Sequence, residues 1–89
     1  MPKKVVVAKL GDCEILVVNT WFSGLTLLVN DEEIRKYDNL VAVSKDKPII
    51  SEHVEINGSK RLIEVFVHAV FTVKIKICVD GAHISGDYF

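Results

Sequence analysis

The segment Val73–Val79 restricts the fold more than any other part of the sequence, because its side chains alternate in polarity. Its odd-numbered positions are apolar: Val73, Ile75, Ile77 and Val79. Lys74 and Lys76 lie between them. Successive side chains of a strand point to opposite faces, so this period of two predicts one face on a core and one face in water. On a helix, Lys74 would share a side with Ile77, which leaves no clean apolar face. We therefore predict a β-strand, followed by a tight turn at Asp80-Gly81.

Apolar segments separated by turn residues recur along the whole chain, and no helix is predicted. We expect strands over residues 4–10, 13–21, 25–29, around 34, 40–43, 49–56, from 62 onward and from 73 onward. Gly11-Asp12 and Asn57-Gly58 are two-residue turn signals, and residues 37–39 are expected to form a loop. Pro48 has no N–H, so it suits a loop or an edge strand. The pattern predicts an all-β antiparallel domain of about seven to eight short strands, with the ending 85–89 left outside them.

The size of the chain limits how much apolar surface its core can hide. Its 89 residues predict a single domain over 1–89. A domain of this size buries only about 60–65% of the surface that its unfolded chain would expose. Yet 49% of the residues are hydrophobic and the mean hydropathy is +0.30. We therefore expect part of the apolar surplus to lie in an interface.

Two halves of the sequence resemble each other when one is shifted by fifty positions. Residues 13–34 then fall on residues 63–84 without a gap, and four positions are identical to their counterparts: Glu14, Val17, Val29 and Ile34. The turn Asn30-Asp31 falls on Asp80-Gly81. This predicts two similar four-stranded antiparallel halves, with an internal duplication as one explanation. The halves would pack as a small sandwich or close as a barrel, and both arrangements give the same alternation.

The same segments resemble the tandem β-repeats of the Fas apoptotic inhibitory molecule family. The pattern G-x-x-x-I-x-V-x-N-x-W-x-x-G begins at Gly11, V-N-D-x-x-I runs from Val29 to Ile34, and V-D-G-x-x-I runs from Val79 to Ile84. The resemblance covers about half of the chain, which is shorter than expected for that family. It implies an antiparallel β-sandwich with a binding role, and it brings no catalytic residues.

Two predicted strands are apolar on both faces, which points to an interface. Beyond the core-facing positions, the outward set comprises Leu16, Val18, Phe66, His68 and Val70. An exposed patch of several large apolar groups is unusual on a monomer. A two-fold dimer is the simplest way to cover it, and His68 would make such an interface sensitive to pH. The alternative is that both strands are central and covered on both sides.

Aromatic residues at strand ends suggest a second function, the binding of a small ligand or peptide. Its pocket would be formed by Trp21, Phe22, Tyr37 and Tyr88. Trp21 continues the inward set of its strand and fits core packing better than a pocket. Phe22 has the opposite parity and is expected to be more exposed.

The remaining residues give no pattern for chemistry. Cys13 and Cys78 are expected to be free thiols rather than a disulfide, a metal pair or a nucleophile. No histidine pair has ligand spacing, so no metal, cofactor or catalytic site is predicted. A formal net charge of -1 argues against binding to nucleic acid or to an anionic membrane. No segment approaches the ~20 apolar residues of a membrane span. We predict a non-enzymatic, self-associating cytoplasmic protein, with a homodimer favoured.

Overall fold

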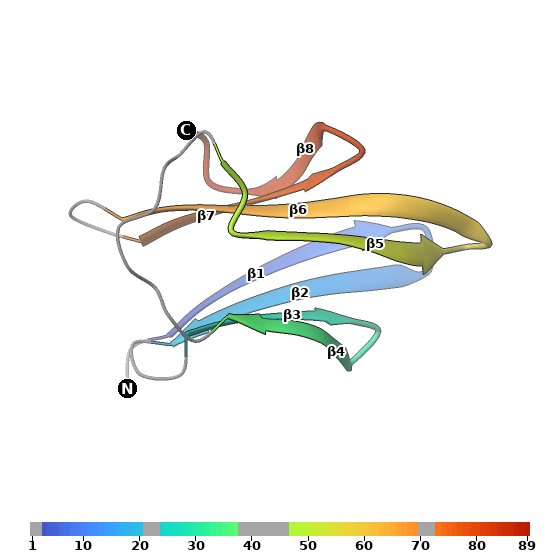
Figure 1. Ribbon diagram of the computed structural model, residues 1–89, viewed down its shortest axis with the longest axis horizontal. Helices are drawn as coiled ribbons and strands as arrows, with labels where there is room; N and C mark the ends of the chain where they lie inside the picture. The colour runs from blue at the N-terminus through green and yellow to red at the C-terminus, as the bar shows by residue number, and fades with distance from the viewer. Residues whose placement is uncertain (1–2, 21–23, 38–46, 70–72) are drawn as a thin grey trace.

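The computed structural model describes residues 3–20, 24–37, 47–69 and 73–89, which form eight antiparallel strands in two sheets (Figure 1). The strands are β1 (Lys3–Leu10), β2 (Cys13–Thr20), β3 (Gly24–Val29), β4 (Glu32–Tyr37), β5 (Ile50–Ile56), β6 (Ser59–Ala69), β7 (Val73–Val79) and β8 (Ala82–Gly86). Sheet A has the order β1-β2-β3-β4 and sheet B the order β5-β6-β7-β8. The predicted all-β class is confirmed, and the two separate sheets make it a sandwich.

The predicted two-residue turns are confirmed, and their backbone angles explain their sequences. Asn57 and Gly58 have φ values of 52° and 81°, and Asp80 and Gly81 have 51° and 86°. Positive φ at both central residues defines the type I′ turn, whose twist matches that of the strands it joins. Gly11, with φ of 62°, begins the turn between β1 and β2.

Several strand ends differ from the sequence prediction by one residue, and three differences are larger or concern residues expected outside strands. β6 begins at Ser59 rather than Leu62, because the tight turn before it pairs Ile56 directly with Ser59. Tyr37, expected in a loop, pairs with Leu25 at the end of β4. Residues 82–86 form β8. In each case hairpin pairing continues through polar residues, which local hydrophobicity does not reveal. The expected strand at 40–43 and the end of the 13–21 strand lie outside the described residues.

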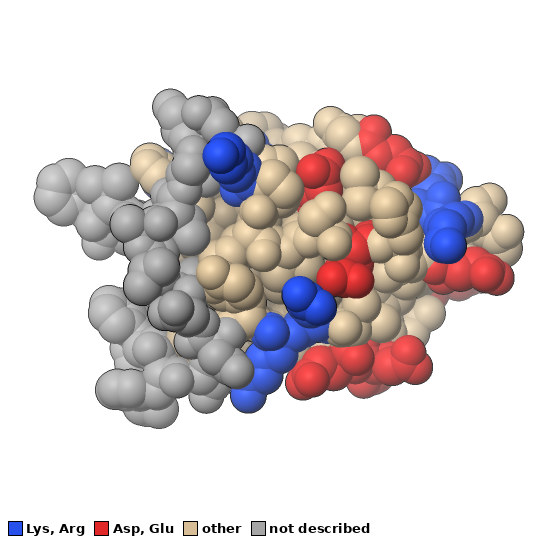
Figure 2. Space-filling view, viewed as in Figure 1, with Lys and Arg blue, Asp and Glu red and all other residues tan. Residues whose placement is uncertain are grey.

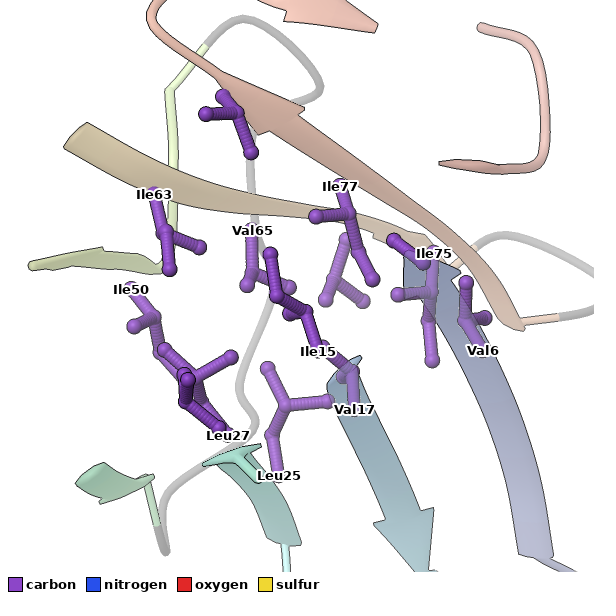
Figure 3. Packing of buried hydrophobic residues seen from close by; sticks show 14 of the residues in the cluster. Val6, Ile15, Val17, Leu25, Leu27, Ile50, Ile63, Val65, Ile75 and Ile77 are labelled. Carbon is purple, nitrogen blue, oxygen red and sulfur yellow. The ribbon is translucent and has the colours of Figure 1, made fainter. Parts of the chain in front are cut away.

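The core fills the layer between the two sheets, with side chains from both pointing into it (Figure 3). The largest fully buried side chains are Ile15, Val17, Leu25, Leu27, Ile63, Val65, Val67, Ile75 and Ile77. In β7, Lys74 is exposed and Lys76 half-buried, whereas Ile75, Ile77 and Val79 are buried, so the predicted alternation is confirmed up to Cys78, which is buried as well. Burial of a side chain of this size stabilises the fold by about 1.5–3 kcal/mol before conformational entropy is counted.

Side-chain contacts connect the edges of the two sheets. Ser85 Oγ of β8 donates a hydrogen bond to the main-chain oxygen of Val7 in β1. On the opposite edge, Arg35 of β4 lies 3.7 Å from a carboxylate oxygen of Glu52 in β5. Pro48 precedes the edge strand β5, as its missing N–H predicts.

The β3–β4 and β7–β8 hairpins have matching details. A register shift lies between Leu27 and Leu28 in one, and between Ile77 and Cys78 in the other. In both, the first turn residue binds the neighbouring strand. Asn30 Oδ1 accepts from the Glu14 N–H at 2.9 Å, and Asp80 Oδ1 accepts from the Leu62 N–H at 3.0 Å.

β2 precedes the first of these hairpins and β6 precedes the second. These two strands match each other at a different offset in residue number from the hairpins themselves. Val29 pairs with Ile15, whereas Val79 pairs with Ile63. The hairpins therefore match at a shift of fifty (Val29 to Val79), but β2 and β6 match at forty-eight (Ile15 to Ile63). A slip of two residues keeps every side chain on its own face, so the two halves remain similar despite the shift.

Candidate interaction surfaces

The outer face of sheet A carries a continuous group of apolar side chains, which we name the sheet A patch. Its members are Val5, Val7, Leu16, Val18 and Leu28. Val5 lies opposite Val18, and Leu16 lies between Val7 and Leu28 in the register of the three strands. Cross-strand neighbours of this kind are about 4.5–5.5 Å apart at Cβ. Val5 and Val7 are 45% and 44% exposed, so the patch is open to solvent along β1.

Charged residues of both signs surround the sheet A patch. They are Lys3 and Lys9 on β1, Glu14 on β2, and Glu33 and Lys36 on β4. The side of the sandwich drawn in Figure 2 likewise has acidic and basic groups interspersed between neutral ones. Neither arrangement is the basic stripe that nucleic acid requires.

Residues 87–89 follow β8 and cover part of the outer face of sheet B, where Phe89 reaches Lys76 of β7 and His68 of β6. We name residues 87–89 the C-terminal strap. Gly86, with φ of 95°, redirects the backbone after β8. A side-chain carbon at Gly86 would lie only 2.2 Å from the main-chain oxygen of Ile75. Glycine is therefore required for the strap to lie along β7.

Asp87 anchors the first residue of the strap to two strands. Its N–H donates to the Ile75 carbonyl oxygen at 2.7 Å, and its carboxylate accepts from the Ile75 N–H at 2.9 Å. The same carboxylate lies 2.7 Å from Lys4 Nζ on β1. The hydrogen bonds from Lys4 and from the Ile75 N–H hold the pKa of the Asp87 carboxyl below its ordinary value.

Phe89 anchors the other end of the strap through Lys76. The Lys76 ammonium lies 4.7 Å from the ring centre of Phe66 and 4.6 Å from that of Phe89. It also donates to the main-chain oxygen of Phe89 at 3.0 Å. The Phe89 ring lies 5.8 Å from the His68 ring. The cation held between two aromatic faces joins the strap to the middle of the sheet.

The pKa values of two further side chains in sheet B and its turns are shifted from their ordinary values. The Leu62 N–H, followed by Arg61, lowers the pKa of the exposed Asp80 carboxyl. Burial raises the pKa of the Cys78 thiol, against a smaller opposing effect of Lys76. A raised pKa leaves less thiolate, so Cys78 lacks the property that makes a cysteine a good nucleophile.

The structure does not bring the predicted interface residues onto one surface. Leu16 and Val18 lie on the outer face of sheet A, whereas Phe66 and His68 lie on the outer face of sheet B. Both faces are outward, but they are on opposite sides of the sandwich. The fifth residue, Val70, lies outside the described residues.

The residues of the alternative ligand pocket are also divided. Tyr37 packs against the core from β4. Tyr88 is 85% exposed, and its ring lies tilted against that of His83, with ring centres 4.6 Å apart. Trp21 and Phe22 lie outside the described residues. The two described tyrosines therefore do not line a shared pocket.

Both cysteines are free and buried: Cys13 is on the core side, and Cys78 is on the opposite parity of β7. Within residues 3–20, 24–37, 47–69 and 73–89, no three His, Cys, Asp or Glu side chains are grouped to hold a metal ion. None of the described segments forms a helix that could cross a membrane.

Sequence reasoning missed three members of the sheet A patch, although a signal was present. The turn at Gly11-Asp12 fixes the register of β1 on β2, which places Val7 opposite Leu16 and Val5 opposite Val18. The run Val5-Val6-Val7 is apolar on both faces, so its outward members could have been assigned to the patch. The strap had no such signal, because its anchors lie far away in the sequence.

Comparison of the chain with family models, with curated proteins and with solved structures found no match in any of the three. The resemblance to the Fas apoptotic inhibitory molecule family therefore remains a prediction, and the function is argued from the surfaces alone.

Proposed function

We propose that this protein is a non-enzymatic interaction module that self-associates through the sheet A patch. The observation that carries the proposal is the continuity of Val5, Val7, Leu16, Val18 and Leu28 on one open sheet face. Burial of apolar surface is the main driving force of protein association. A flat sheet face can pack against another sheet at about 10 Å, as in the interior of a sandwich.

A second copy of the chain is the partner that this face suits best. The face measures about 20 Å in each direction from strand spacing and rise, so two copies would bury on the order of 1,000 Å² in total. That area is at the lower limit for a specific interface, so we expect a dimer that dissociates on dilution. The formal net charge of -1 gives little repulsion between copies. The charged residues around the sheet A patch are of both signs, so they do not favour a strongly charged partner.

Molar mass tests this proposal. Light scattering after size exclusion, over a hundredfold dilution, should show wild-type chains moving between one and two times the chain mass of 10.0 kDa. The double variant Val7→Lys/Leu16→Glu should stay monomeric at every concentration. His53→Lys is the matched control, because it adds a charge at an exposed position on the outer face of sheet B. A wild-type monomer throughout, or an unchanged dimer in the double variant, would contradict the proposal.

We also propose that the protein works in a reducing compartment, and in the cytoplasm in particular. The support is that Cys13 and Cys78 are both free and buried. Labelling of denatured protein taken directly from its own cells should find two free thiols. A thiol count of zero would contradict this location.

A further inference from the structure

We infer that Ser85 and Asp87 are positioning residues for self-association, because they hold strand β1 and with it the exposed half of the sheet A patch. The inference rests on the proposed dimer through this patch, and it assigns a role in that dimer to two residues of the other half of the molecule. Neither residue belongs to sheet A: Ser85 lies in β8, and Asp87 is the first residue after that strand.

The strand β1 is the edge strand among the three that form the patch. In the order β1-β2-β3-β4 it is paired on one side, whereas β2 and β3 are each paired on both sides. Yet β1 supplies Val5 and Val7, the two patch members that are exposed rather than half-buried. Segments with few neighbours have low local stability. The part of the patch that is most open to a partner is therefore the part that its own sheet holds least firmly.

Two polar contacts join this edge strand to residues 85–87. Ser85 Oγ donates a hydrogen bond to the main-chain oxygen of Val7. A carboxylate oxygen of Asp87 lies 2.7 Å from Lys4 Nζ. Since Lys4 comes directly before Val5 in β1, one contact is made at an exposed member of the patch and the other beside the second exposed member.

Residues 85–87 can restrain β1 because they are themselves fixed to β7. Ser85 pairs with Ile77 in the ladder between β7 and β8. The Asp87 N–H donates to the Ile75 carbonyl oxygen at 2.7 Å, and the Asp87 carboxylate accepts from the Ile75 N–H at 2.9 Å. Both isoleucines are fully buried. The position of β1 is therefore tied to a strand whose side chains are held in the core.

Loss of these contacts weakens the dimer through the monomer. A monomer whose β1 has shifted does not present Val5 and Val7 together with the rest of the patch, and both copies of a two-fold dimer must present the same surface. The apparent dissociation constant therefore rises with the inverse square of the fraction of correctly arranged monomers. If about half of the monomers keep the arrangement, the dissociation constant rises about fourfold.

The test is the double variant Ser85→Ala/Asp87→Asn, whose dimer dissociation constant is measured by light scattering over a dilution series. Asparagine keeps an oxygen that accepts from the Ile75 N–H, so the variant removes the contacts with β1 while the strap stays bound to β7. We expect the dissociation constant to rise about three- to tenfold. Amide exchange should become faster in β1 and stay unchanged at Ile75. Ser85→Thr/Asp87→Asn, which keeps a hydroxyl, should weaken the dimer less.

Arg61→Ala is the matched control, because it removes an ion pair with Asp80 of similar length, 2.9 Å, that joins β6 to the turn after β7. It should leave the dissociation constant unchanged. A dimer that is equally strong in the wild type and in Ser85→Ala/Asp87→Asn would overturn this inference and leave the proposed dimer in place. Equal weakening by Arg61→Ala would also overturn it, because general loss of stability would then be the cause. A wild-type chain that stays monomeric at every concentration would contradict the proposed function itself.

Discussion

Sheets A and B have the same strand order, tight turns and a matching bulge, yet their outer faces are completed in different ways. On sheet A, Val5 and Val7 remain nearly half exposed. On sheet B, the strap contacts β7 and β6, and Lys76 is held between two rings. Strand alternation therefore sets which side chains point outward on both sheets, whereas a short segment beyond the last strand covers part of the outward face on sheet B alone.

The largest expected effect comes from the glycine that directs the strap. Gly86→Ala places a side-chain carbon against the Ile75 carbonyl oxygen and strains a positive φ, so we expect a loss of about 2–4 kcal/mol in the free energy of unfolding. Gly81→Ala is the matched control. Its φ is also positive, but nothing lies within 4 Å of the added carbon, so about 1 kcal/mol should be lost. Urea unfolding measures both, and equal losses would show that the close approach of the strap is unimportant.

The next effect separates the two faces of a single strand. Val6 points to the core and is 7% exposed, whereas its neighbour Val7 belongs to the sheet A patch. Val6→Thr buries an unsatisfied hydroxyl and should cost about 1–3 kcal/mol of stability. Val7→Thr should change stability by less than about 0.5 kcal/mol, but it should weaken the dimer. Thermal unfolding of the monomer measures the stability of both variants. Molar mass over a dilution series measures the strength of the dimer. An intact dimer in Val7→Thr would weaken the assignment of the patch.

A smaller effect is expected from the aromatic end of the strap. Phe89→Ala removes one side of the aromatic pair around Lys76 and the contact with His68, so the free energy of unfolding should fall by about 1 kcal/mol. Tyr88→Ala, at an 85% exposed side chain, should cost less than half of that. If Tyr88→Ala proved the more harmful change, the strap would be held by its exposed ring rather than by the contacts of Phe89 with Lys76 and His68.

The smallest effect is a dependence on pH. The pKa of the Asp87 carboxyl is lower in the folded chain than in the unfolded chain, where it is about 3.9. Its contribution to stability is therefore complete above about pH 4 and is lost as the pH falls through the lower folded value. Asp87→Asn should make the loss of thermal stability between pH 5 and pH 2 shallower. Asp12→Asn, which removes a carboxylate from the exposed turn between β1 and β2, is the matched control.

Most of the fold could be predicted from sequence because alternation and turn chemistry are local signals. The strand Val73–Val79 and the turns at Asn57-Gly58 and Asp80-Gly81 were predicted from their own residues and are confirmed. The candidate site was predicted less completely. Leu16 and Phe66 were correctly placed outward, but which sheet each belongs to depends on the assembly of the whole chain. The strap depends on contacts of Asp87 with Lys4 and Ile75, and no local pattern encodes them.

The most direct test of the central claim, that copies meet through sheet A and not sheet B, is an isotope-filtered nuclear Overhauser measurement on a mixture of labelled and unlabelled chains. We expect intermolecular signals among the methyl groups of Val5, Val7, Leu16, Val18 and Leu28. No intermolecular signal is expected from Leu62 or Phe66, which lie on the outer face of sheet B. Intermolecular signals from Leu62 or Phe66, or a dimer with no signal from the sheet A patch, would contradict that claim.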